Sequence, residues 1–317
     1  MKKIAPLILL FPLFSFLIRK EKQVPALSRH FLENKMIYFP QGSVHLPGVN
    51  AEGKSTKTVS VSSFYMYPYE VSNMLYRVFA YDVGLTDFSL YEKILPDTLV
   101  WRHKLAYNEP YVEYYYRHPA YRDYPMVGIS HEQCELFCKW LTEKYNADPD
   151  RKFKKVIFNL PTKNQWYYAA AESLSDDNGK KNVIPPARLF PWSGPYLRNG
   201  KGLILANFKE IDQATIKGEN ATDNNFIRNA DYGVAGTLND NADVTAPVNA
   251  YLPNEAGLYN MAGNVEEFVR EKGITKGGSW NDTGFYLRND VEEKYDSTNS
   301  VSSSRGFRFV MEVVEAK

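Results

Sequence analysis

The sequence is poor in cysteine, in net charge and in long apolar runs, and each shortage excludes a class of protein. Two cysteines in 317 residues are too few for a disulfide-stapled scaffold or a cysteine-rich zinc module. The 38 Lys and Arg residues balance 37 Asp and Glu residues, so the net charge is only +1. A nucleic-acid-binding protein would carry a basic surface, and we therefore expect no nucleic-acid partner.

The remaining composition is that of a packed globular protein with unusually many tyrosines. Hydrophobic residues make up 44% of the chain, charged residues 24%, and there are 23 Tyr. Short apolar stretches alternate with Gly, Pro and Asn, and neither a repeat nor a linker interrupts residues 33–317. This pattern predicts one α+β domain with a few helices, many short strands and little regular secondary structure.

The first twenty residues are typical of an export signal. Two lysines precede an apolar run of 15 residues from Ile4 to Ile18, which is shorter than the roughly 20 residues that span a bilayer. We expect a signal peptide or N-terminal anchor over residues 1–20, a lead-in over 21–32 and the domain over 33–317. The protein is therefore expected to be exported, with membrane association through the N-terminus if the run is retained.

Four segments carry local patterns of regular structure. Alternation over residues 59–66 predicts a strand, and apolar spacing over 70–81, 130–145 and 162–171 predicts helices. The helix at 130–145 is the clearest, because Ser130 can cap it and Gln133 can complete a capping box.

Eight segments stand in the order found in a known family. They are residues 36–43, 64–73, 125–130, 137–140, 159–162, 257–268 (GLYNMAGNVEEF), 277–280 (GGSW) and 305–308 (RGFR). Together they resemble the formylglycine-generating-enzyme, or sulfatase-modifying-factor, family and cover nearly all of residues 36–311. The resemblance implies a compact C-type-lectin-like α+β fold.

A narrower resemblance lies in residues 96–130, which are similar to the gliding-motility and type IX secretion lipoproteins, the J and K components. That resemblance implies a non-catalytic structural or assembly protein of the periplasm or the outer-membrane-associated cell envelope. Its partners would be envelope proteins of a secretion or motility machine. The chain departs from these lipoproteins because no lipid-acceptor cysteine follows the apolar run.

The resemblance also implies copper chemistry, but the required thiolates are missing. Family enzymes bind copper with two cysteines near the GGSW block, because Cu(I) prefers sulfur. Those positions fall on Asp282 and Leu287 here, so we expect no copper and interpret the chain as a pseudoenzyme. Cys134 and Cys138 lie one turn apart on the helix at 130–145, where buried thiols are favoured over a redox or metal pair.

Two other functions stay open. A related branch of the family uses histidine-bound non-haem iron, so a metal-dependent iron or copper oxidoreductase is one alternative. No tight histidine ligand motif supports it, although His118 and His131 could approach each other. The fold also permits a lectin-like ligand-binding module.

Calcium is the cofactor that the resemblance favours, in a structural role. The implied ligands of the first site are Asn260, Gly263, Val265 and Glu267, and those of the second are Asn207, Phe208, Asp240 and Ala242. Oxygen donors on irregular loops suit this hard cation. Asp243 is an alternative to Asp240, and the same polar residues could instead satisfy turns.

A tyrosine-rich segment is the predicted interaction surface. Its members are Tyr111, Tyr114, Tyr115, Tyr116 and Tyr121. Tyrosine combines apolar area with a hydroxyl and is common at interfaces. The alternative is that about half of these rings fill the core.

Overall fold

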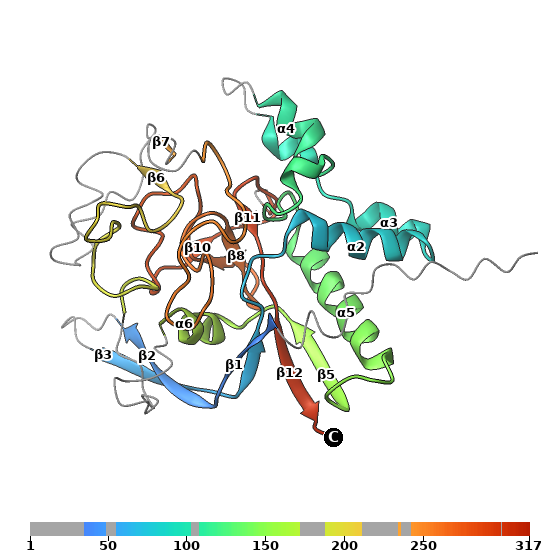
Figure 1. Cartoon of the computed structure of the whole chain (residues 1–317), viewed down its shortest axis with the longest axis horizontal. Coiled ribbons are helices and arrows are strands. Elements are labelled where there is room, and N and C mark those ends of the chain that lie inside the picture. Colours follow the sequence, from blue (N-terminus) through green and yellow to red (C-terminus); the bar gives the residue numbers. More distant parts are fainter. Residues whose placement is uncertain are drawn as a thin grey trace, which may run out of the picture.

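Helices gather on one side of the molecule, and irregular loops around a small sheet form the other side (Figure 1). The computed structural model describes residues 35–48, 55–102, 108–171, 188–210, 234–235, 242–298 and 300–317. The predicted signal or anchor at 1–20 and the lead-in at 21–32 lie outside this range. Within the part described, no helix is both long and apolar enough to cross a bilayer.

The main sheet pairs strands from the first and the last part of the domain. Its order is β1-β4-β12-β5, with all neighbours antiparallel. These strands are β1 (Ile37–Phe39), β4 (Phe64–Met66), β12 (Val310–Glu315) and β5 (Lys155–Asn159). A separate hairpin joins β2 (Gly42–Gly48) to β3 (Ser55–Val61), so the predicted strand at 59–66 is in fact split between β3 and β4.

The helical side is built from α2 (Asn73–Gly84), α3 (Phe88–Ile94), α4 (Glu109–Tyr114), α5 (His131–Ala147) and two short 3-10 helices, η1 (Thr98–Trp101) and η2 (Pro119–Tyr121). The prediction for α5 is confirmed in detail. Ser130 Oγ accepts a hydrogen bond from Gln133 N, and Gln133 Oε1 accepts one from Ser130 N at 2.7 Å. Phe137 and Leu141 of its buried stripe belong to the cluster that also contains Phe158 of the main sheet.

Two other predicted helices also form, and the prediction of the first residue is right for one and wrong for the other. Helix α6 (Lys163–Ala171) begins after Thr162, as expected. Helix α2 begins at Asn73 instead of Glu70, because Ser72 caps it and the Glu70 side chain turns into the core.

A second, smaller sheet contains two buried carboxylates, Glu266 and Glu267. Its order is β10 (Glu293–Lys294), β9 (Ile274–Lys276), β8 (Glu266–Phe268) and β11 (Arg305–Gly306), with β8 and β11 parallel. Two further short strands, β6 (Lys209–Glu210) and β7 (Val234–Ala235), form a separate antiparallel pair. Because side chains alternate along a strand, adjacent residues of β8 project to opposite faces.

Candidate functional site

Segments far apart in the sequence meet at one buried carboxylate, Glu70. Its Oε2 accepts hydrogen bonds from Asn260 Nδ2 at 3.0 Å and Asn264 Nδ2 at 2.8 Å, and its Oε1 accepts one from Val265 N at 3.2 Å. Burial raises the pKa of Glu70 to about 8, and the nearby negative charge of Glu267 adds to this shift. The network therefore joins the 64–73 segment to the 257–268 segment.

Two side chains, Arg308 and Trp166, hold Glu267 within the same region. Arg308 Nε lies 2.8 Å and 2.7 Å from its two carboxylate oxygens, and Trp166 Nε1 donates to Oε2 at 2.8 Å. Arg308 also donates to the carbonyl of Tyr259 at 2.8 Å. Both partners of this ion pair are fully buried, so the hydrogen bonds offset the cost of removing the two charges from water.

The first predicted calcium site contains one available oxygen and one engaged carboxylate. Asn260 Oδ1 is buried and has no hydrogen-bond partner among the residues that the structure describes. Gly263 and Val265 follow in the same tight turn, in which Asn260 has a φ of 49° and Gly263 a φ of 74°. A cation here would use Asn260 Oδ1, whereas ligation by Glu267 would compete with Arg308 and Trp166.

The second predicted site lies against the first. Asn207 has no exposed surface, its Nδ2 donates to Val244 O at 2.7 Å, and its Oδ1 lacks a partner within the described part of the chain. A Cβ on Gly263 would lie 2.3 Å from Asn207 O, so only glycine permits this approach. Phe208, which follows Asn207, is buried, and so is Ala242, while Asp240 lies outside the described residues.

These observations fit calcium only in part, and calcium stays a prediction. The two open amide oxygens suit a hard cation, and structural calcium would stabilise the long loops around them. Among the described residues, however, no three His, Cys, Asp or Glu side chains are grouped as metal ligands.

The side chains at the two positions that correspond to the copper-binding cysteines differ chemically from thiolates. Leu287 is fully buried in an apolar cluster with Phe190, Phe208 and Phe285. Asp282 accepts a hydrogen bond from the Ser279 hydroxyl. A leucine in an apolar core offers no ligand atom, so this pair of positions cannot hold copper in the way that two thiolates would.

Asp282 instead belongs to a crowded group of carboxylates. Glu266 pairs with Arg305 at 2.8 Å and accepts a hydrogen bond from the Thr275 hydroxyl. Burial raises the pKa of Asp282, and it raises those of Glu266 and Glu293 to about 7 and about 9. Repulsion between the carboxylates adds to the shifts at Glu266 and Glu293, while Arg305 opposes them. The group can hold protons near neutral pH.

Cys134, Cys138, His118 and His131 lie within the described residues, and each has structural surroundings there. Cys134 and Cys138 are free thiols inside the main apolar cluster, and burial raises the pKa of each thiol. His131 is buried and its Nε2 lies 2.8 Å from Val269 O, while His118 Nδ1 accepts a hydrogen bond from Ala120 N. Each of these side chains therefore has a structural contact of its own.

The predicted tyrosine surface is divided between core and solvent. Tyr115 is only 2% exposed, and its hydroxyl donates to Pro125 O at 2.7 Å. Tyr114 is 46% exposed, while Tyr111, Tyr116 and Tyr121 are half-buried. Buried Tyr115 therefore cannot contact a partner protein directly, and it can only pack beneath the more exposed tyrosines of the predicted surface.

Sequence reasoning missed the tryptophans that join this surface to the GGSW block. Trp101 packs on Tyr115 with ring centroids 4.6 Å apart and stacks on Trp280 at 6.3 Å. Trp101 ends η1, and Trp280 directly follows Ser279. Trp101 lies within the 96–130 segment and Trp280 within the GGSW block, but no local pattern indicates that two rings 179 residues apart, from 101 to 280, would stack.

Comparison with known proteins agrees with this architecture. Residues 21–313 match the sulfatase-modifying factor enzyme 1-like domain family, so the chain belongs to that family. The formylglycine-generating enzyme of Mus musculus is 25% identical over 280 residues, which are 80% of this chain and 63% of that enzyme. The Bos taurus enzyme is 24% identical over 322 residues, covering 86% of this chain and 74% of that one. The chain thus spans less than two thirds of the mouse enzyme's length.

A solved structure, PvdO from Pseudomonas aeruginosa, has the same general fold. Its TM-score is 0.50 at 15% sequence identity, with 87% of this chain and 94% of that chain covered. At this identity the likeness concerns the fold alone. The predicted α+β, formylglycine-generating-enzyme-like domain with little regular secondary structure is therefore confirmed.

Proposed function

We propose that this chain is a non-catalytic cell-envelope protein that acts by binding other proteins, of the gliding-motility and type IX secretion type. One observation carries the proposal: Asp282 and Leu287 occupy the positions of the copper-binding cysteines, and Leu287 is part of an apolar core. The two cysteines that the chain does contain are buried elsewhere, on α5. The fold is thus that of the enzymes without their thiolate pair.

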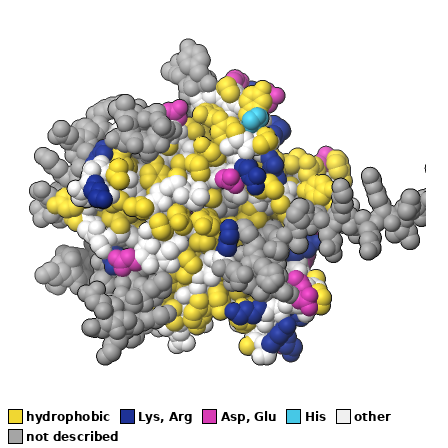
Figure 2. Space-filling view, in the orientation of Figure 1, with side chains coloured by type: hydrophobic (Ala, Val, Ile, Leu, Met, Phe, Trp, Pro, Cys, Tyr) yellow, Lys and Arg dark blue, Asp and Glu magenta, His cyan; other side chains and the backbone are white. Residues whose placement is uncertain are grey.

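The helical side offers apolar area for a protein partner. Tyr81, Leu85 and Phe88 are exposed where α2 ends and α3 begins, and Phe88 is 67% exposed. In Figure 2 apolar side chains gather at the α3 end of the molecule. Tyr114 and Leu99 add exposed apolar surface on α4 and η1. Large apolar side chains of this kind often mark protein-binding surfaces.

In this proposal the protein is exported and works in the periplasm or at the outer membrane. Its partners are envelope proteins of a secretion or motility machine, and calcium, when present, has a structural role at Asn260 and Asn207. The narrower resemblance of residues 96–130 supports this assignment.

Crosslinking followed by pull-down from native envelope extract tests the proposal. We expect specific envelope proteins to be recovered with the unaltered chain and lost with the double variant Leu85→Ser/Phe88→Ser. Leu252→Ser is a matched control, because Leu252 is 70% exposed but belongs to a loop outside the helices. Recovery of no specific protein, or equal recovery with all variants, would contradict the proposal.

An oxygen-uptake assay addresses the enzymatic alternative. Protein incubated with copper or ferrous iron and a thiol-containing peptide should consume no more oxygen than the metal and peptide alone. Metal-dependent, saturable uptake would favour the oxidoreductase instead. Specific hits on a glycan array would favour the lectin-like alternative.

A further inference from the structure

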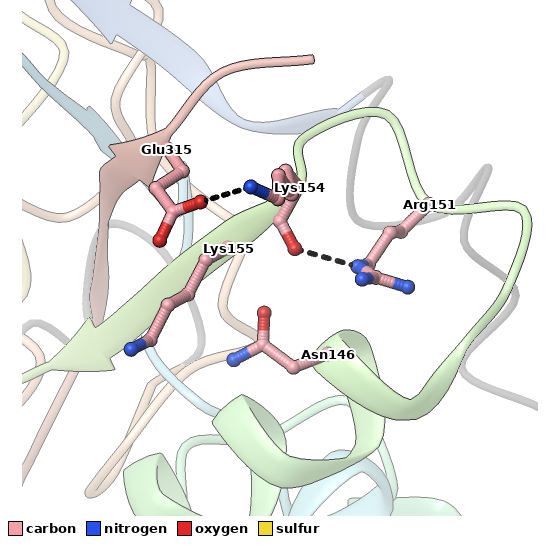
Figure 3. Close-up of a pocket in the computed structure, with 5 residues that line it drawn as sticks. All are labelled: Asn146, Arg151, Lys154, Lys155 and Glu315. Atoms are coloured by element: carbon pink, nitrogen blue, oxygen red, sulfur yellow. Dashed lines mark hydrogen bonds and ion pairs between the residues drawn. The ribbon is translucent and has the colours of Figure 1, made fainter.

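The edge strands of the two sheets are held in place very differently. Strand β5, at the edge of the main sheet, is held by side chains at the end of α5, in the turn after it and on β12 (Figure 3). The Asn146 amide exchanges hydrogen bonds with Val156 N and O at 3.0 Å and 2.8 Å, and Arg151 Nε donates to Lys154 O at 2.8 Å. Lys154 Nζ also forms an ion pair with Glu315 at 2.6 Å. Backbone groups that an edge strand would otherwise expose are thus satisfied on β5.

Strand β10, at the edge of the small sheet, is paired over a much shorter length. It pairs with β9 over two residues, with Glu293 opposite Thr275. One further backbone hydrogen bond runs from Tyr295 N to Gly273 O at 3.1 Å. A short strand with few hydrogen bonds opens at a lower free energy than the core of a domain.

The chain is fixed firmly just before β10. The Nζ atom of buried Lys276 donates to Asn289 O at 2.6 Å and to Val291 O at 2.7 Å. After these bonds, residues 292–295 run along β9, and we call them the β10 strap. The Tyr295 ring packs on the edge of the Phe268 ring with centroids 5.3 Å apart. The strap therefore covers part of the small sheet and is anchored at its start.

Glu293 brings a carboxyl group into the crowded group of carboxylates around Arg305. The hydroxyl of Thr275, its partner in the strand register, donates to Glu266, so both acids lie on the same face of the sheet. Glu293 Oε2 is buried and has no hydrogen-bond partner among the residues that the structure describes. Burial raises the pKa of Glu293 to about 9, the charges of Asp282 and Glu266 add to this shift, and Arg305 opposes it. Ionised Glu293 would be poorly solvated and repelled by its neighbours.

The lysines of this region do not relieve that repulsion. Lys276 and Lys294 project to the opposite face of the sheet, because side chains alternate along β9 and β10. Lys209 instead opposes the rise in the pKa of Asp282. Among the described residues, the guanidinium of Arg305 is therefore the cation that acts on the carboxyl group of the strap.

We propose that the β10 strap is a pH-sensitive latch, which is closed while Glu293 carries a proton and is released from β9 when Glu293 ionises. In the released strap Glu293 faces water, where a glutamate has a pKa of about 4.3. The closed form thus holds a proton that the released form loses, so a rise in pH favours release. Release would uncover Phe268 and the carboxylates around Arg305. The inference does not rest on the proposed protein-binding function, because it concerns other residues.

Glu292 provides a matched control on the same strap. Its carboxylate forms an ion pair with Lys163 at 3.2 Å, and both side chains are partly exposed. Glu292→Gln and Glu293→Gln therefore remove the same formal charge from adjacent positions. Only the second change removes the group that faces the other carboxylates.

Amide hydrogen exchange of the full chain, followed by NMR from about pH 6 to about pH 8, tests the latch. We expect the Tyr295 amide to be less protected than the Phe137 amide of α5, because the strap opens without global unfolding. After correction for intrinsic exchange, its protection should fall about tenfold more per pH unit in the unaltered chain and in Glu292→Gln than in Glu293→Gln, which is the share of one proton. Equal protection of Tyr295 and Phe137, or equal pH dependence in the two variants, would overturn the proposal.

A direct titration of the unaltered protein requires no variant to fold for its midpoint. The carbon-13 NMR signal of the Glu293 carboxyl group, assigned by its absence in Glu293→Gln, should titrate with a midpoint above about pH 7. A midpoint below about pH 5 would overturn the proposal, because the closed strap would then contain an ionised Glu293 at neutral pH.

Discussion

Glu266 and Glu267 are neighbours on β8, but they lie on opposite faces of the small sheet and in different electrostatic surroundings. Glu267 has one guanidinium, that of Arg308, and an indole donor from Trp166. Glu266 shares the guanidinium of Arg305 with two further carboxylates. On the first, balanced face Glu267 has a counterion, and burial raises the pKa of the neighbouring Glu70 to about 8, so that Glu70 keeps its proton at neutral pH. On the other, crowded face three carboxylates share one guanidinium.

The two faces also differ in their relation to the family. Glu267 and Arg308 belong to the segments 257–268 and 305–308 that carry the resemblance, and their contacts hold those two segments together. Asp282, in the crowded group on the other face, is a position at which this chain departs from the enzymes. The balanced face thus joins segments of the family pattern, and the crowded face contains Asp282, one of the two positions at which the copper-binding cysteines are replaced.

Breaking the balanced face should have the largest effect. Arg308→Met leaves Glu267 buried without its counterion, and we expect unfolding free energy to fall by about 3–5 kcal/mol. Urea denaturation followed by circular dichroism measures this loss. The double change Glu267→Leu/Arg308→Met should recover part of it, because no charge then remains unpaired. A loss below about 1 kcal/mol in the single variant would show that the pair is not structurally important.

Calcium should stabilise the balanced side of the sheet. If the ion uses Asn260 Oδ1, adding calcium to chelator-treated protein at about 100 times its Kd should raise unfolding free energy by about 2.7 kcal/mol. Thermal melts with and without calcium measure the shift, and Asn260→Ala should abolish it. A calcium-dependent shift that persists in Asn260→Ala would place the ion elsewhere.

The crowded face should make stability depend on pH. The pKa of Glu293 is raised to about 9, so the folded chain retains a proton that the unfolded chain loses above about pH 4.3. Stability should therefore fall as pH rises from about 5, by up to about 1.4 kcal/mol per pH unit for this one group. Above about pH 8, Lys276 acts in the opposite direction, because burial lowers its pKa to about 8.

Chemical denaturation at several pH values between 5 and 8 measures this slope. Glu293→Gln replaces the protonated acid by a neutral amide and should reduce the slope by the share of this one group. Glu266 and Glu70, whose pKa values are raised to about 7 and about 8, keep their own shares. An unchanged slope in Glu293→Gln would assign the pH dependence to other groups.

A substitution on α5, away from both faces of the small sheet, serves as a control for these effects on stability. Ser130→Ala removes the hydroxyl cap of α5 and should cost about 1 kcal/mol. The cost should be equal at every pH and with or without calcium, as measured by urea denaturation. A cost that varies with either condition would mean that α5 is coupled to the small sheet.

Local patterns accounted for the helices but not for the polar networks. The capping box of α5 involves residues three apart, so a sequence pattern can reveal it. The start of α2 was predicted three residues early, because nothing local indicates that Glu70 bonds to Asn260, 190 residues away. The tyrosine segment was identified by its composition, which did not distinguish buried Tyr115 from exposed Tyr114.

The sequence by itself determined the family, through the order of its motifs, and the missing thiolates, through the residues at positions 282 and 287. Only the tertiary structure decided that three carboxylates share Arg305 on one face of β8 while Glu267 has a counterion of its own on the other. Those partners come from distant segments, and their charges interact only after folding has buried them together.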